Sequence, residues 1–491
     1  MNWVHSVFRA LCSLLYFLPS PPRGNALLNS KSQIWLGVIV MLSLLSLAGC
    51  GGSGSASFQQ QTSVSISGSP PSAIGVGANW QYTATVTGAT NQSVTWTIAP
   101  TTAGMIDPNT GLYIAPLAVP NPAKVTITAT SQAIPSQSAS TSVTVQATDP
   151  IGTVSGVTTL PSCSGSLQGA TCFQMTVSCP GVADLTAYLK VNNPNALPVG
   201  TVLFGVGTGG SGLYDDPNAG GFMMGETTVQ NILTVGNFNT VQVSFGAPFN
   251  PTPPQPNGWL QGPGGVRRLA CRYATLADWV YHNPKTINPN PNNTATTSAP
   301  MCATGNSGGS GAIAYAVYEY GLDSEFAMIE PTSGPPMARI DQGCSPCNSN
   351  VQGPVCTDAS SMNNANLCYE PADAAIIDEA YQSAGASSPT LCTNALNGNT
   401  PPSGLFQSDS IVYNPGTNNK ISLPHTTVKQ LFGDLDTSNA VPQGMVWGQS
   451  VSPGPGSPNP IAACIADAGH PIPDVLDGAR QIASDIQQYC H

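Results

Sequence analysis

The pentapeptide Gly-Asn-Ser-Gly-Gly at residues 305–309 is the segment of this sequence best suited to chemistry. It fits the pattern Gly-x-Ser-x-Gly and leads into a run without helix breakers that predicts a helix (residues 312–320). A sharp strand-to-helix turn strains the backbone of its serine, and neighbours without side chains avoid clashes there. The positive end of the helix dipole also faces this position. The pattern therefore predicts a nucleophile, Ser307.

A chain with 51 glycines contains such a pattern by chance as well, so the serine needs a base and an acid as partners. The run Gly-Asn-Ser-Gly-Gly is also similar to the serine site of chymotrypsin-type proteases, whose histidine and aspartate precede the serine across a double β-barrel. Upstream of Ser307 the histidines are His5, near the N-terminus, and His282, on a predicted helix close to the serine. No double barrel fits into that short interval, which excludes the protease fold.

Downstream of Ser307 the order Ser…Asp…His is met. A run that predicts a strand (residues 427–433) ends in a glycine and is followed by Asp434, Asp436 and a Val-Pro dipeptide. This segment resembles the one after the penultimate strand of α/β-hydrolases, where an aspartate stands three residues past a glycine. The resemblance implies Asp436 as the acid of a catalytic triad, with Asp434 as the alternative.

His470 precedes a run that predicts the last helix (residues 474–488), whose first aspartate is a candidate N-cap. The α/β-hydrolase family carries its general base on the loop between the last strand and the last helix, so the resemblance implies His470 as the base. His282 and His425 are the other histidines between the N-terminal leader and the C-terminal residue, and neither holds that position.

Hydrolysis by a serine also needs backbone N–H groups that stabilise the oxyanion. The resemblance implies Gly308, the residue after the nucleophile, as one donor. The second donor is expected from the glycine-rich loop at residues 207–212, which follows an early predicted strand as the family's His-Gly-Gly loop does. Gly-Thr replaces His-Gly here, so the donor is either Thr208 or Gly209. A phosphate-binding loop is disfavoured because no lysine follows the glycines.

The region from residue 156 to residue 491 alternates predicted strands with predicted helices. Strand candidates lie at 201–206, 240–245, 326–329 and 427–433, and helix candidates at 227–235, 267–282 and 312–320. This alternation predicts an α/β fold, a mainly parallel sheet with helices on both faces.

A long insertion, at about residues 340–425, separates the strand candidates at 326–329 and 427–433 and holds five cysteines and a predicted helix (residues 370–381). The resemblance to α/β-hydrolases implies a disulfide-rich cap over the pocket. Five further residues are expected in the pocket wall: Pro331, Pro335, Pro336, Tyr214 and Trp447.

Residues 63–147 differ in composition and pattern from the region that follows. Thr, Ser, Val and Ala alternate there with period two between turns of Gly, Pro and Asn. This pattern predicts an all-β sandwich. The runs Val-Thr-Trp at residues 94–96 and Gly-Leu-Tyr-Ile-Ala-Pro at residues 111–116 resemble bacterial Ig-like domains, which implies a spacer or adhesion module.

The N-terminal residues indicate export. The apolar run Ile34–Leu47 is short for a membrane span and has the length of a signal-peptide core. Small residues directly before Cys50 resemble the bacterial lipoprotein signal, with a plain secretory signal as the alternative. The resemblance implies a signal peptide (residues 1–49), lipidation of Cys50 as a membrane anchor, and a flexible tether (residues 50–62).

Export changes the interpretation of the cysteines. Twelve remain outside the leader and position 50, an even number that predicts up to six disulfides in an oxidising compartment. Cys344 and Cys347 have the C-x-x-C spacing of a zinc ligand pair, but no regularly spaced partners follow, so disulfides are favoured over a metal. Cys490 is a candidate partner of Cys464. No metal or cofactor is expected.

Charge adds an exclusion. With 13 Lys and Arg against 24 Asp and Glu, the net charge is −11, so the chain carries no basic footprint for nucleic acid.

The predicted function is a cell-envelope or secreted serine hydrolase that cleaves carboxylic esters through an acyl-enzyme. The alternative is a non-catalytic surface binding or adhesion protein that keeps a hydrolase fold. Amide and polyester substrates stay open, because the serine motif does not specify the acyl or leaving group.

Overall fold

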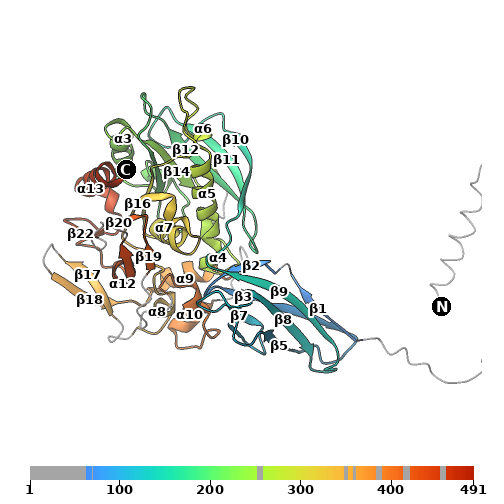
Figure 1. Ribbon diagram of the computed structural model, residues 1–491. Coiled ribbons are helices and arrows are strands. Elements are labelled where there is room, and N and C mark those ends of the chain that lie inside the picture. The colour runs from blue at the N-terminus through green and yellow to red at the C-terminus, as the bar shows by residue number, and fades with distance from the viewer. Residues whose placement is uncertain are drawn as a thin grey trace, which may run out of the picture. The chain divides into compact units, whose positions relative to one another are not determined.

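The central sheet of the described part of the chain has nine strands (Figure 1). The structure is a computed structural model and describes residues 62–68, 70–250, 258–347, 352–357, 361–382, 390–412, 421–453 and 461–491. The predicted signal peptide, Cys50 and all but the last residue of the predicted tether lie outside these residues. Across the sheet, the strands follow one another as β10 (Thr153–Thr159), β11 (Thr171–Ser178), β12 (Leu185–Asn192), β14 (Asn239–Ser244), β13 (Thr201–Gly205), β15 (Met301–Asn306), β16 (Phe326–Thr332), β20 (Thr427–Gly433) and β22 (Ile461–Ile465).

The strands from β14 to β22 pair in parallel, whereas β10, β11, β12 and β14 pair antiparallel. The central parallel strands β13 and β15 are buried along their whole length, as expected for strands covered on both faces. Because parallel strands end at one edge, the loops after β13, β15, β20 and β22 meet there. These loops carry Ser307, the glycine-rich segment at residues 207–212, Asp436 and His470.

Helices cover both faces of the sheet, which confirms the predicted α/β class. On one face α5 (Cys271–His282) and α7 (Gly308–Tyr318) pack into the larger apolar core, and on the other face α3 (Gly225–Thr234) and α13 (Leu476–Tyr489) form a second core. The remaining helical segments outside the insertion are α4 (Val266–Leu269), α6 (Pro284–Ile287), α12 (Ala440–Ser450), η1 (Pro217–Ala219), η2 (Gly258–Leu260), η3 (Leu322–Ser324) and η4 (Ile472–Asp474).

One predicted helix start is wrong. The last helix begins at Leu476 and has no side-chain cap, whereas Asp474 lies in η4. There its Oδ1 accepts a hydrogen bond from Met223 N at 2.8 Å, so the carboxylate joins two loops instead of capping α13.

Residues 63–147 form the predicted all-β region. Its strands are β1 (Ser63–Ser67), β2 (Ala73–Gly75), β3 (Asn79–Gln81), β4 (Thr83–Thr87), β5 (Val94–Ala99), β6 (Met105–Ile106), β7 (Leu112–Ile114), β8 (Lys124–Ser131) and β9 (Ser138–Gln146). In β8 every second side chain is buried, and those between them are exposed or half-buried, as period two requires. The inward side chains of several strands share one core around Trp96, Tyr113 and Ile127.

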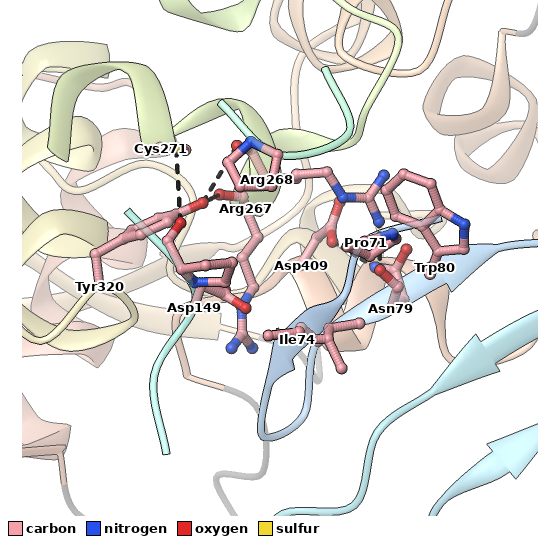
Figure 2. Close-up of a pocket in the computed structure, with 14 residues that line it drawn as sticks. Pro71, Ile74, Asn79, Trp80, Asp149, Arg267, Arg268, Cys271, Tyr320 and Asp409 are labelled. Carbon is pink, nitrogen blue, oxygen red and sulfur yellow. Dashed lines mark hydrogen bonds and ion pairs between the residues drawn. The ribbon is translucent and has the colours of Figure 1, made fainter. Parts of the chain in front are cut away.

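A buried ionic cluster joins this β-sandwich to the α/β region (Figure 2). The Arg267 Nε donates to Asp149 Oδ2 at 2.6 Å, and its Nη2 donates to Val76 O at 2.8 Å. The Asn79 Nδ2 donates to Asp409 Oδ1 at 2.7 Å, so the sandwich also contacts the insertion. The sandwich is therefore tied to both the sheet region and the insertion by polar contacts shielded from water.

The insertion between β16 and β20 contains α8 (Ile340–Gly343), β17 (Gln352–Thr357), β18 (Ser361–Asn366), α9 (Pro371–Glu379), α10 (Leu391–Leu396), α11 (Leu405–Asp409) and β19 (Ile421–Leu423), which pairs with β21 (Val451–Pro453). The disulfides Cys344–Cys392 and Cys347–Cys368 link segments of the insertion covalently. The two cysteines of the C-x-x-C segment are thus disulfide-bonded, as favoured over a zinc site.

Three further disulfides join described cysteines: Cys163–Cys172, Cys179–Cys271 and Cys302–Cys490. The predicted Cys464–Cys490 pair is wrong, and Cys464 has a disulfide of its own. Helix α13 runs back along the sheet after the last strand, so Cys490 reaches the start of β15, while Cys464 stands at the end of β22. Disulfides in this number are typical of an oxidising compartment.

Candidate active site

Ser307 stands in a strained turn between β15 and α7. Its backbone angles are φ 53° and ψ −118°, a conformation that non-glycine residues rarely adopt. The glycines on either side are required by close contact. A Cβ at Gly309 would lie 2.6 Å from Val206 O, and a Cβ at Gly305 would lie 2.9 Å from the carbonyl carbon of Gly309. The turn thus has the geometry that the pentapeptide predicts.

Hydrogen bonds hold this turn against two neighbouring segments. Ser307 N donates to Thr332 O of β16 at 2.9 Å. The Asn306 Oδ1 accepts from Thr332 Oγ1 at 2.8 Å and from Ile472 N at 3.2 Å. Asn306, which stands between the first glycine and the serine of the motif, therefore links the serine turn to the segment that follows His470.

The structure brings His470 and Asp436 together. The His470 Nδ1 lies 2.9 Å from Asp436 Oδ2, and the Asp436 Oδ1 accepts from Ser438 N at 2.9 Å. Burial by itself raises the pKa of Asp436. The hydrogen bond and the charge of His470, together with the hydrogen bonds of Ser438, outweigh this effect of burial, so the pKa of Asp436 is lowered. The ionised carboxylate favours the tautomer with its proton on Nδ1, which leaves Nε2 of the imidazole as the basic nitrogen.

The loops that carry the acid and the base approach each other closely at Gly433. A Cβ there would lie 2.1 Å from Ala468 O, so only glycine fits. Asp434 N donates to Ile465 O at 3.1 Å, but its buried Oδ1 has no hydrogen-bond partner in the described part of the chain. The alternative acid is thus bound to the histidine loop through its backbone, and Asp436 is the carboxylate that reaches the imidazole.

The glycine-rich loop after β13 lies directly against the serine turn. A Cβ at Gly308 would lie 1.7 Å from Thr208 O, and Thr208 has a left-handed backbone with φ 51°. Within the described residues, neither the N–H of Thr208 nor that of Gly308 donates to a backbone carbonyl. The N–H of Gly209 likewise donates to no backbone carbonyl of the described residues, but Thr208 lines the pocket and Gly209 does not. Of the two predicted alternatives, the geometry therefore favours Thr208.

Ser307 and His470 line one pocket with a volume of about 400 Å³. The residues that line it are Thr208, Ser307, Gly308, Pro336, Met337, Tyr369, Glu370, Asp373, Ile376, Ile377, Ser438, Asn439, Ala440 and His470. This volume is in the range of small-molecule sites. A cavity at the junction with the β-sandwich (Figure 2) has a volume of about 30 Å³, which is too small for a substrate.

The predicted pocket wall is largely wrong. Of its five residues only Pro336 lines the pocket. Tyr214 lies in the second core, where its ring packs edge-on against Phe204 and Phe222, and Trp447 is fully buried in the larger core. The insertion supplies the wall instead, through α9 and the residues before it. The sequence predicts this helix, but its amphipathic pattern does not reveal which side chains face the serine.

One group of potential metal ligands occurs among the described residues, namely Asp278, His282 and Glu325. The two residues on α5 stand four positions apart, and the His282 Nδ1 lies 3.4 Å from Asp278 Oδ1. None of the three lines the pocket of Ser307. This group therefore adds nothing to the chemistry there.

The parallel sheet, the serine turn after β15 and the histidine loop after β22 give the chain an α/β-hydrolase fold. No protein-family model matches the chain, and no curated protein matches its sequence. Within the described residues, no helix combines the length and apolar character that a membrane span needs.

Several solved structures are similar to this chain. Est1E from Butyrivibrio proteoclasticus has 10% sequence identity and a TM-score of 0.34, with 64% of this chain and 96% of that chain covered. The acetyl xylan esterase from Paenibacillus sp. R4 has 11% identity and a TM-score of 0.38, with 68% and 87% covered. A soluble variant of the monoglyceride lipase from Saccharomyces cerevisiae has 12% identity and a TM-score of 0.35, with 67% and 96% covered.

Proposed function

We propose that this protein is a serine hydrolase that cleaves carboxylic esters through an acyl-enzyme intermediate. The observation that carries the proposal is the convergence of three features on one pocket of about 400 Å³. These are a serine on a strained turn, an imidazole bonded to a buried carboxylate, and two backbone N–H groups beside the serine that donate to no backbone carbonyl of the described residues.

The proposed mechanism begins with attack of the Ser307 Oγ on the ester carbonyl. The Nε2 of His470 accepts the hydroxyl proton, and Asp436 stabilises the imidazolium. The N–H groups of Gly308 and Thr208 donate to the oxyanion. The imidazolium then protonates the leaving alcohol, and water attacks the acyl-enzyme with His470 again as the base.

The place of action is part of the proposal. Export agrees with the disulfides at the described cysteines. A lipid on Cys50 would anchor the protein in the cell envelope through the tether at residues 50–62. We propose that residues 63–147 are an Ig-like domain and residues 156–491 the hydrolase domain, with the insertion at about 340–425 as its cap. Because the buried cluster around Arg267 joins these parts, we expect them to move together.

The test is turnover of p-nitrophenyl esters by the full chain and by Ser307→Ala, together with labelling by a fluorophosphonate. We expect the wild type to turn over short-chain esters and to carry the label on Ser307, as mapped by mass spectrometry. The variant should lose activity by about 10⁴-fold or more with an unchanged unfolding temperature. Undetectable turnover and labelling of the wild type would instead favour a non-catalytic binding protein.

A further inference from the structure

The described side chains that line the pocket of Ser307 include acidic groups but no lysine or arginine. The acidic groups are the carboxylates of Glu370 and Asp373. Glu370 precedes α9 and Asp373 lies in its first turn, so they stand three positions apart on the same side of the helix. Both residues lie at the N-terminal end of α9, where a helix favours acidic side chains.

Within the part of the chain that the structure describes, neither carboxylate forms an ion pair with a lysine or an arginine. Asp373 Oδ2 accepts from Asn439 Nδ2 at 2.7 Å, and this partner is a neutral amide. The nearest cation along the chain, Arg339, stands two residues after Met337 of the wall. Its guanidinium is used by Asp341, because Nε and Nη2 donate to the two carboxylate oxygens at 2.8 Å each. Glu370 is exposed and Asp373 is half-buried, so both carboxylates are accessible from the pocket and carry a charge that no described cation pairs.

Tyr369, the residue directly before Glu370, also lines the pocket. Its hydroxyl donates to Pro336 O at 2.8 Å, and burial, followed by the charges of Asp373 and Asp341, raises its pKa well above the usual 10. The ring stays neutral and lies beside Met337, Ile376 and Ile377, whose side chains give the same pocket an apolar lining.

We infer that this pocket selects esters by charge, with Glu370 and Asp373 favouring a cationic group and disfavouring an anionic one. The inference rests on the proposed esterase function and names its substrate class, namely esters that carry an uncharged or, better, a cationic ammonium group. A unit charge about 6 Å from a carboxylate at an effective dielectric constant of about 40–80 changes binding by about three- to tenfold.

The experiment compares esters of equal shape and different charge. In the acyl series, the p-nitrophenyl esters of 4-(trimethylammonio)butyrate, 5,5-dimethylhexanoate and 4-sulfobutyrate differ at the terminal group. In the alcohol series, butyrate esters of choline, 3,3-dimethylbutanol and 2-sulfoethanol do the same. We expect kcat/KM of the full chain to fall from cation to neutral ester to anion in at least one series, by about three- to tenfold per step.

The double variant Glu370→Gln/Asp373→Asn should bring the three values of that series to within about twofold. The matched control is Glu226→Gln, which removes one exposed carboxylate on α3, outside the pocket, and should leave the order unchanged. Equal values in both series, a faster anion, or an order that persists in the double variant would overturn the inference and leave the esterase proposal intact. No turnover of the neutral esters together with no fluorophosphonate label would overturn the proposed function and the inference with it.

Discussion

Two buried carboxylates in this protein each hold a nitrogen-bearing side chain, one at the junction with the β-sandwich and one at the pocket. At the junction, Asp149 accepts from Arg267 at 2.6 Å. At the pocket, Asp436 bonds to His470 at 2.9 Å. The two pairs are similar in length and in the burial of the carboxylate, so the difference lies in what surrounds the nitrogen-bearing partner.

The guanidinium of Arg267 finds partners within the protein. Besides Asp149, it contacts Glu319 Oε2 at 2.7 Å, Val76 O at 2.8 Å and Ser408 O at 3.4 Å. The His470 side chain is 35% exposed and lines the pocket. A closed network of charges maintains structure, whereas a base with one ring nitrogen unused beside a cavity is able to exchange a proton with a ligand.

The largest effect is expected when the Asp436–His470 pair at the pocket loses the charge of its carboxylate. Asp436→Asn keeps the shape of the side chain but favours the wrong imidazole tautomer, so kcat for p-nitrophenyl esters should fall by about 10⁴-fold. Unfolding by denaturant, followed by circular dichroism, is the control for the fold. A loss of less than about tenfold would show that Asp436 does not orient the base.

At the junction with the β-sandwich, Arg267→Met should lower the stability of the fold. It leaves the carboxylate of Asp149 buried without its cation, so the free energy of unfolding should fall by about 3–5 kcal/mol. The matched control is Arg480→Met, because Arg480 forms an exposed ion pair with Asp477 on α13 and should change stability by less than about 0.5 kcal/mol. Equal effects in both variants, measured by urea unfolding, would refute the comparison.

Gly308→Ala tests the contact between the serine turn and the loop after β13. The added Cβ would lie 1.7 Å from Thr208 O, so the loop must move away from the serine. Loss of one oxyanion donor typically lowers kcat by about 10²–10³-fold. We expect that loss in a steady-state assay, with labelling of Ser307 by a fluorophosphonate slowed as well. Unchanged kcat would argue against Thr208 as a donor.

The pH dependence of stability distinguishes the two carboxylates beside Arg267. Burial, together with the smaller effects of the charges of Asp149 and Asp409, raises the pKa of Glu319 from its ordinary 4.5 to about 8, and the charge of Arg267 only partly offsets this. Glu319 therefore stabilises the fold fully below pH 4.5, and this contribution is lost as the pH rises through about 8. We expect the free energy of unfolding to fall by about 1–3 kcal/mol over this interval.

Glu319→Gln should flatten that dependence, because a glutamine stays neutral at both ends of the interval. Thermal unfolding at several pH values between 5 and 9 measures it. A slope that is the same in the variant and in the wild type would assign the pH dependence to another group.

The serine turn and the strand before Asp436 were predictable because each has a local cause. Gly305 and Gly309 approach each other within the serine turn, and the strand at residues 427–433 has the predicted bounds. The pocket wall was not predictable in this way. Tyr369 and Asp373 reach the pocket through the folding of the insertion, which depends on contacts between residues far apart in the chain. The same holds for Cys490, whose partner depends on the direction of α13 across the sheet.

By itself, the sequence determined the α/β class, the β-sandwich and the order of Ser307, Asp436 and His470, because hydrophobic period and turn chemistry act within a few residues. Only the tertiary structure decided that Thr208 rather than Gly209 faces the pocket and that α9 brings two carboxylates to it. It also decided that Arg267 joins the sandwich to the rest of the chain. These outcomes depend on how buried surfaces fit in three dimensions, and spacing along the chain does not contain that information.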